Sequence, residues 1–172
     1  MGLVKMAVIL SALVLFVGIS TIAHAQKTEG ALYQITVNYG QNLGQMIEAG
    51  RYDYVSYDIT VTNFPVQEKG TAEVSIKLVH FDRSMRTEEA IVELNEMGLR
   101  PATLPELLAF GAKYPQVQCQ FPVVALDSIW QDRSGDRNAP YLWGSYAGER
   151  RLDLTSIRGR WDWNYRFAAV PK

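Results

Sequence analysis

The chain has little of what most catalytic and metal sites are built from. It contains one cysteine and two histidines in 172 residues, so it can form no internal disulfide and offers few metal ligands. Its 17 basic side chains nearly balance its 18 acidic ones, which argues against a nucleic-acid partner held by bulk charge. Gly-x-y and heptad repeats are missing, which excludes a fibrous chain. What it has in quantity is apolar side chain, 48% of the sequence, which predicts one packed domain.

Residues 1–25, MGLVKMAVILSALVLFVGISTIAHA, are typical of a signal peptide. A lone Lys5 precedes an uncharged apolar run, which ends in AHA, the small-x-small pattern that signal peptidase cuts after. We therefore predict a secreted or periplasmic chain that begins at Gln26. The alternative is an uncleaved membrane anchor, because the run approaches the roughly 20 residues that a spanning helix needs.

Two segments of the predicted mature chain, 31–39 and 72–81, alternate apolar and polar side chains as half-buried strands do. Between them, the apolar spacing of 41–49 predicts a short helix that ends at Gly50. Aromatic and β-branched residues concentrate after this glycine, and they predict a shorter strand over 57–62.

Two further helices are predicted in the middle of the chain. The first has Thr87 as its N-cap. Its expected buried stripe is Ile91, Leu94 and Met97. The second begins with TLPE, a capping box in which Thr103 and Glu106 exchange side-chain to backbone hydrogen bonds. Short strands and loops follow Phe121, so the order of elements predicts a single α+β domain over 26–172.

Four motifs between Leu99 and Val170 resemble the bacterial and phage branch of the C-type lectin-like fold: LRPATLPELLAF, ALDSIW, RRLDL and WDWNYRFAAV. That branch includes formylglycine-generating enzymes and phage tropism determinants, and the chain is similar to an uncharacterised secreted bacterial group that shares GLRPATLPELLAF. The resemblance implies two central helices with small antiparallel sheets, and paired N- and C-terminal strands, so that 33–39 would lie beside 166–170. Two family features are missing: the sugar-binding triplets of the calcium-dependent lectins, and the cysteine pair of the formylglycine-generating enzymes.

His80 is the only histidine after the predicted cleavage site, so a histidine-based mechanism would have to use it. Its phase on the strand 72–81 favours a hydrogen-bonded histidine at the edge of the core. Cys119 precedes an apolar run and is expected to be half-buried. Oxygen donors alternate in DRSGDRN, residues 132–138, as around calcium, but Arg133 and Arg137 favour a solvated hairpin turn. No catalytic residue, metal or cofactor is assigned.

Aromatic and arginine side chains concentrate near the C-terminus, a combination used by protein interfaces and carbohydrate platforms. The candidate ligand-binding residues are Trp143, Tyr146, Arg158, Arg160, Trp161, Trp163 and Tyr165. For Trp161 and Trp163 the pattern leaves core and surface equally open. We predict a non-enzymatic recognition or structural module whose partner is a protein or glycan surface. The alternative is a cell-envelope hydrolase or lyase that uses carboxylates such as Asp127 and Asp132 with His80.

Overall fold

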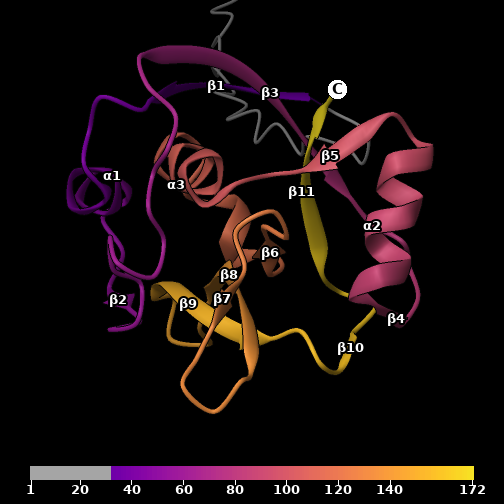
Figure 1. Cartoon of the computed structure of the whole chain (residues 1–172). Helices are drawn as coiled ribbons and strands as arrows, with labels where there is room; N and C mark the ends of the chain where they lie inside the picture. The colour runs from indigo at the N-terminus through magenta and orange to yellow at the C-terminus, as the bar shows by residue number, and fades with distance from the viewer. Residues whose placement is uncertain (1–31) are drawn as a thin grey trace, which may run out of the picture.

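The computed structural model describes residues 32–172, so the predicted signal segment and its cleavage site lie outside the described residues. Within this range the chain forms an α+β domain (Figure 1). The elements in chain order are β1 (Leu32–Asn38), α1 (Leu43–Gly50), β2 (Tyr54–Val55), β3 (Thr71–Val79), β4 (Met85–Arg86), α2 (Thr87–Glu96), β5 (Leu99–Pro101), α3 (Leu104–Lys113), a 3-10 turn (Val117–Cys119), β6 (Val123–Val124), β7 (Trp130–Gln131), β8 (Arg137–Gly144), β9 (Arg150–Ser156), β10 (Arg160–Trp161) and β11 (Arg166–Pro171). None of the helices described is long and apolar enough to cross a membrane.

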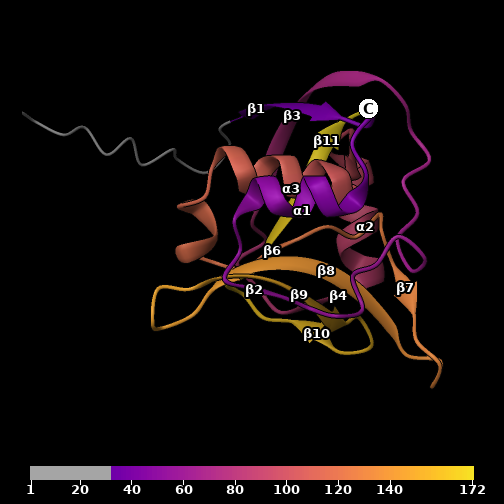
Figure 2. The same cartoon turned by 90° about the vertical axis from the view of Figure 1, so that its left-hand side faces the viewer.

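A single mixed sheet organises the domain. Its strands follow the order β1-β3-β11-β6-β8-β9-β2, with β5 paired to β11 and β7 paired to β8, while β10 and β4 form a separate two-stranded ladder. Figure 2 shows α1 and α3 side by side between the β1–β3 end of the sheet and the β8–β9 end. The sheet therefore curves around these two helices, and α2 lies on the other side of β11 (Figure 1).

Strand β11 separates two hydrophobic cores, because its side chains alternate between the two faces of the sheet. Ala168 and Val170 belong to the core that surrounds α3. Phe167 and Ala169 belong to a second core beneath α2. The C-terminal strand is thus a central element of the fold.

The local patterns in the sequence explain most of the elements. Tyr33, Ile35 and Val37 of β1 are buried and their neighbours are exposed, as predicted from their alternation. The capping box of α3 is confirmed: Thr103 Oγ1 accepts the Glu106 N–H at 3.4 Å, and the Glu106 carboxylate accepts the Thr103 N–H at 2.8 Å. All three predicted helices are present in the described chain.

Helix α2 differs in detail from its prediction. Its N-cap is Arg86, and Thr87 is the first helical residue. The buried side chains are Thr87, Ala90 and Leu94, whereas Met97 is 51% exposed. Two members of the predicted stripe are confirmed, because Leu94 is buried and Ile91 packs partly buried against the second core. Met97 is exposed because it is the C-cap, beyond the last helical residue, Glu96.

The predicted strand over 57–62 is wrong, and the strand lies earlier, at β2. Residues 57–62 form turns in which the Asn63 side chain donates to the Asp58 carbonyl at 2.8 Å. Tyr57 and Val61 are 85% and 64% exposed, so these apolar side chains do not belong to a half-buried strand.

The predicted pairing of the terminal strands is also wrong. Strand β3 lies between β1 and β11 and is antiparallel to both. Lys77 is opposite Leu32 on one side and opposite Ala169 on the other. Within the described residues, only the β10–β4 ladder is a small antiparallel sheet of the kind expected. The other strands join in one large mixed sheet, because the parallel pairing of β11 with β6 connects β1 and β3 to β8, β9 and β2.

Candidate functional site

The outward face of strands β8, β9 and β2 carries aromatic side chains around one arginine. Leu142 and Leu152 point inward and are fully buried, so their neighbours along each strand point outward. Trp143 lies opposite Arg151, and Arg151 lies opposite Tyr54. The guanidinium carbon of Arg151 is 5.1 Å from the Trp143 ring centroid and 4.1 Å from the Tyr54 centroid. Two cation–π contacts therefore hold this arginine across three strands.

Two tyrosines continue this face toward the C-terminal strand. The Tyr141 ring is stacked on Trp143, with centroids 6.4 Å apart and planes 6° apart, and its centroid is 6.2 Å from that of Tyr165. Burial, and then Asp153, raises the pKa of Tyr141; burial, and then Asp162, raises the pKa of Tyr165. Both phenols therefore remain protonated at neutral pH and keep a hydrogen to donate. We define the aromatic face as Tyr54, Tyr141, Trp143, Arg151 and Tyr165.

A groove of about 460 Å³ separates the aromatic face from residues 118–122. Tyr141, Trp143 and Tyr165 contribute rings to its lining. The polar part of the lining comprises Gln118, Gln120, Ser145, Asp162 and Asn164. The groove thus combines rings with amides, hydroxyls and one carboxylate, and its lining contains no lysine or arginine. This composition suits an uncharged polar ligand that also has an apolar side.

Gln118 fixes the backbone that carries the groove. It is 1% exposed, and its Nε2 donates to the carbonyls of Trp143 at 2.9 Å and Arg151 at 3.2 Å. Its Oε1 accepts from Arg150 Nη2 at 3.1 Å. A buried amide with these partners holds β8 and β9 to the segment on the opposite side of the groove.

Arg150 extends this support to the helices inside the sheet. It donates to the Gly50 carbonyl at 2.6 Å and to the Gly111 carbonyl at 2.8 Å, and its guanidinium carbon lies 5.1 Å from the Tyr52 ring centroid. A Cβ at Gly50 or Gly111 would approach the Tyr52 side chain to 2.2 or 2.3 Å, so both positions require glycine. Burial raises the pKa of Tyr52, and Arg150 partly opposes this. The aromatic face therefore has a rigid, packed base.

Four of the predicted ligand-binding residues lie at or beside the groove. Trp143, Tyr146 and Tyr165 line it, and Tyr146 is fully exposed in the β8–β9 turn. Trp163 is 63% exposed in the β10–β11 turn, between two residues that line the groove. The four side chains therefore lie near one another, and their role in binding stays a prediction.

Trp161 lies in the second core and is removed from the predicted surface. It is 4% exposed, its Nε1 donates to Thr87 Oγ1 at 3.0 Å, and its ring packs edge-on against Phe167. The spacing of two between Trp161 and Trp163 left this choice open, and the short strand β10 turns the first ring inward.

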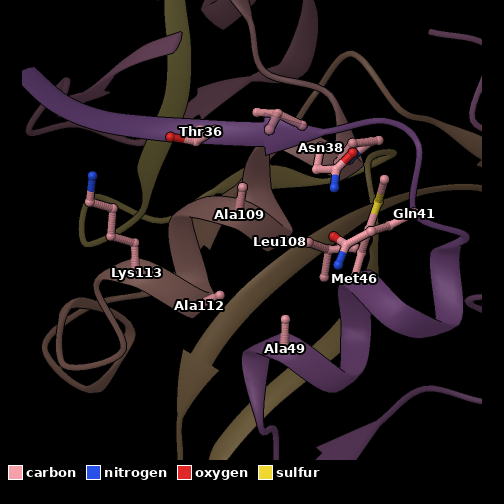
Figure 3. A pocket seen from close by; sticks show the side chains of 11 residues that line it. Thr36, Asn38, Gln41, Met46, Ala49, Leu108, Ala109, Ala112 and Lys113 are labelled. Carbon is pink, nitrogen blue, oxygen red and sulfur yellow. The ribbon is translucent and has the colours of Figure 1, made fainter. Parts of the chain in front are cut away.

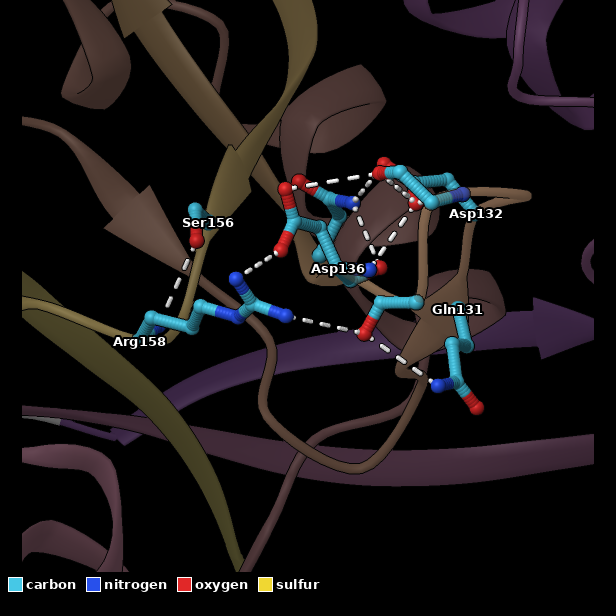
Figure 4. Close-up of polar contacts among 8 residues, drawn as sticks. Gln131, Asp132, Asp136, Ser156 and Arg158 are labelled. Atoms are coloured by element: carbon cyan, nitrogen blue, oxygen red, sulfur yellow. Dashed lines mark hydrogen bonds and ion pairs between the residues drawn. The ribbon is translucent and has the colours of Figure 1, made fainter.

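Arg158 and Arg160 do not line the groove either. Figure 4 shows Arg158 joined to Asp136, with 2.5 Å between Nη1 and Oδ1. Arg160 donates to the Ser84 carbonyl at 2.7 Å and lies 3.6 Å from the Glu89 carboxylate. Both arginines hold neighbouring turns in place.

The hairpin turn predicted within 132–138 is present, and it comprises residues 132–136 between β7 and β8. Asp132 Oδ1 accepts the N–H groups of Ser134 and Asp136, both at 2.9 Å (Figure 4). The Ser134 hydroxyl, and then the Asp136 N–H, lowers the pKa of Asp132. Across residues 32–172, no three His, Cys, Asp or Glu side chains are grouped so that they could hold a metal ion.

His80 has the hydrogen-bonded position expected at the edge of the core. Its side chain is 11% exposed, and Nε2 lies 2.7 Å from the Trp163 carbonyl and 3.8 Å from Asp82 Oδ1. The two carboxylates suggested as its catalytic partners lie on other connections, Asp127 between β6 and β7 and Asp132 in the β7–β8 turn.

Cys119 is exposed, so the expected half-buried thiol is wrong. It ends the 3-10 turn in which Gln118 takes the inward position. Cys119 is one of the residues that line the groove, and its Sγ lies 3.9 Å from the Pro115 carbonyl oxygen.

Comparison with known proteins identifies no relative. No family model matches the chain, and neither a curated protein nor a solved structure matches it. The site must therefore be interpreted from its own residues. The candidate list drawn from the sequence omitted Tyr54, Tyr141 and Arg151, although the alternation in PYLWG and RRLDL carried the signal for two of them.

Proposed function

We propose that the chain is a non-enzymatic recognition module, secreted or periplasmic, which binds its ligand in the groove beside the aromatic face. The observation that carries this proposal is the stacked pair Tyr141 and Trp143 on the outward side of the sheet, next to a groove of about 460 Å³. Tyr141 also packs against the second core, but Trp143 belongs to neither core, and a binding surface gains area from such a ring at little entropic cost.

The ligand that the lining fits best is an uncharged glycan. Sugar rings have apolar faces that pack on aromatic rings, and hydroxyl groups that pair with amides and carboxylates such as Gln120, Asn164 and Asp162. A charged ligand is less favoured, because the only ionised side chain in the lining is Asp162 and Arg151 is already 3.6 Å from Glu149.

The C-type lectin-like assignment stays a prediction. Its main topological support was the expected pairing of the terminal strands, and the position of β3 between them removes that support. Secretion likewise stays a prediction from residues 1–25. No observation favours the hydrolase or lyase alternative.

The proposal is tested by titrating the purified protein with neutral oligosaccharides, such as β-1,4-linked glucose and N-acetylglucosamine hexamers, in an isothermal calorimeter. We expect saturable binding that Tyr146→Ala and Asn164→Ala each weaken by about fivefold. Both side chains lie at the groove and are exposed, so their loss leaves the fold intact.

Tyr57→Ala is the matched control, because it removes another exposed tyrosine, which does not line this groove. Binding that falls equally in all three variants, or that is unchanged in all of them, would contradict the site. A partner protein that cross-links through position 146 while no oligosaccharide binds would contradict the ligand class.

A further inference from the structure

A second groove, of about 420 Å³, lies on the other side of the domain between β1, α1 and α3 (Figure 3). Apolar side chains dominate its lining, among them Met46, Ala49, Leu108, Ala109 and Ala112. The alanines leave room between the helices and the strand, and Figure 3 shows their methyl groups facing this space. The groove is separate from the aromatic face, with which it shares no lining residue.

One rim of this groove is the open edge of the large sheet. Strand β1 ends the strand order and pairs on one side only, with β3. The Tyr39 N–H donates to the Gly70 carbonyl, so the odd-numbered residues of β1 form the hydrogen-bonded pairs with β3. The N–H and C=O of Thr36 therefore point away from β3, and within residues 32–172 no partner is found for them.

The open part of the β1 edge is short, because the carbonyl groups of Gln34 and Asn38, on either side of Thr36, already accept hydrogen bonds. The Gln34 carbonyl accepts the Tyr114 hydroxyl at 2.9 Å, which closes the groove at that end. The Asn38 carbonyl accepts the Gln41 N–H at 3.2 Å at the other end. Between these two hydrogen bonds, the N–H and C=O of Thr36 and the N–H of Asn38 can still pair with one short extended segment.

A single cation marks the closed end. Lys113 is the only charged residue in the lining, and its Nζ lies 5.9 Å from the Tyr114 ring centroid. No carboxylate within residues 32–172 pairs with it. The arrangement thus offers backbone hydrogen bonds along an edge, an apolar floor, and one unpaired positive charge where the edge stops.

From this we propose that the groove binds the C-terminal end of an extended peptide from a partner protein. The peptide adds to β1 as an antiparallel strand at Thr36, lays alternate apolar side chains against Ala109 and Ala112, and places its terminal carboxylate beside Lys113. Strand addition supplies affinity through the main chain, and the floor and the lysine select the apolar side chains and the free carboxylate. This proposal is independent of the function proposed for the aromatic face.

The test uses the full purified chain labelled with ¹⁵N and a pool of hexapeptides. The peptides carry Val, Ile, Leu or Phe at the last and third-last positions and end in a free carboxylate. We expect saturable shifts of the Thr36 and Asn38 amide signals at peptide concentrations up to about 1 mM. The same pool with C-terminal amides should bind about fivefold more weakly, because it lacks the charge that faces Lys113.

Two variants check the binding site. Lys113→Glu should weaken the carboxylate pool and leave the amide pool unchanged, and Ala109→Trp should fill the groove and abolish both. Arg133→Glu is the control, because it makes the same change of sign in the exposed β7–β8 turn.

Three outcomes would overturn the proposal. They are the absence of shifts at Thr36 and Asn38 at the highest peptide concentration, shifts confined to the aromatic face, and shifts at β1 that grow with protein concentration alone. The last result would identify a second copy of the chain as the occupant.

Discussion

The ion pair between Arg100 and Glu106 gives the sharpest prediction of stability. Glu106 is 1% exposed, and its carboxylate accepts from Arg100 at 2.6 and 3.0 Å and from the Thr103 N–H at 2.8 Å. Hydrogen bonding to this carboxylate raises the pKa of the Arg100 guanidinium. Arg100→Ala would remove two of the three donors and leave a buried carboxylate at the start of α3.

Breaking a buried ion pair costs about 3–5 kcal/mol, because the remaining charge is uncompensated. The Arg100 side chain is 40% exposed, so water can enter beside Glu106, and we expect the lower end of that range, about 3 kcal/mol. For a domain of this size, such a loss lowers Tm by about 10 °C. Glu106→Gln/Arg100→Ala should cost less than the sum of the two single changes, because the double variant leaves no buried charge.

Urea unfolding monitored by circular dichroism measures these losses. Arg83→Ala is the matched control, because Arg83 pairs with Glu93 on the surface of α2, with side chains 52% and 27% exposed. It should cost at most about 0.5 kcal/mol. Equal losses for Arg100→Ala and Arg83→Ala, or additive losses in the double variant, would refute the reasoning.

Three other predictions follow from the fold and the sequence. Deletion of 166–172 should unfold the domain, because β11 is hydrogen-bonded to β3, β5 and β6. Deletion of 171–172 should lower the free energy of unfolding by at most about 1 kcal/mol, and thermal melts of the two truncated chains compare them. Gly111→Ala should destabilise by about 1–3 kcal/mol, since its Cβ would lie 2.3 Å from the Tyr52 hydroxyl, and Tyr52→Phe should recover part of the loss in urea titrations. The intact mass of the exported protein should correspond to a chain that begins at Gln26. A full-length chain in the membrane fraction would instead indicate an anchor.

The sequence predicted those parts of the fold that depend on neighbouring residues. The alternation of β1 and β3 and the capping box at Thr103 are local patterns, and each appears in the structure where expected. The segment 57–62 misled because Tyr57 and Val61 are apolar but exposed. Strand pairing was wrong because it depends on contacts between distant residues: nothing local in β11 shows that its partner is β3.

The candidate site was predicted in part for the same reason. The aromatic residues of the β8–β9 turn and the β10–β11 turn were recognised from their composition. The row from Trp143 through Arg151 to Tyr54 was not, because it requires the parallel pairing of β2 with β9. Gln118 was missed because a single glutamine in a loop carries no pattern that reports its burial.

The most direct test of the central claim follows the four tryptophan indole N–H signals in ¹⁵N spectra during titration with the oligosaccharide hexamers. Trp143 lines the groove and Trp161 lies in the core, so the two side chains act as an internal comparison. We predict that the Trp143 signal shifts and saturates with the binding curve while the Trp161 signal stays in place. An unchanged Trp143 signal at saturation, or equal shifts of Trp143 and Trp161, would contradict recognition at the aromatic face.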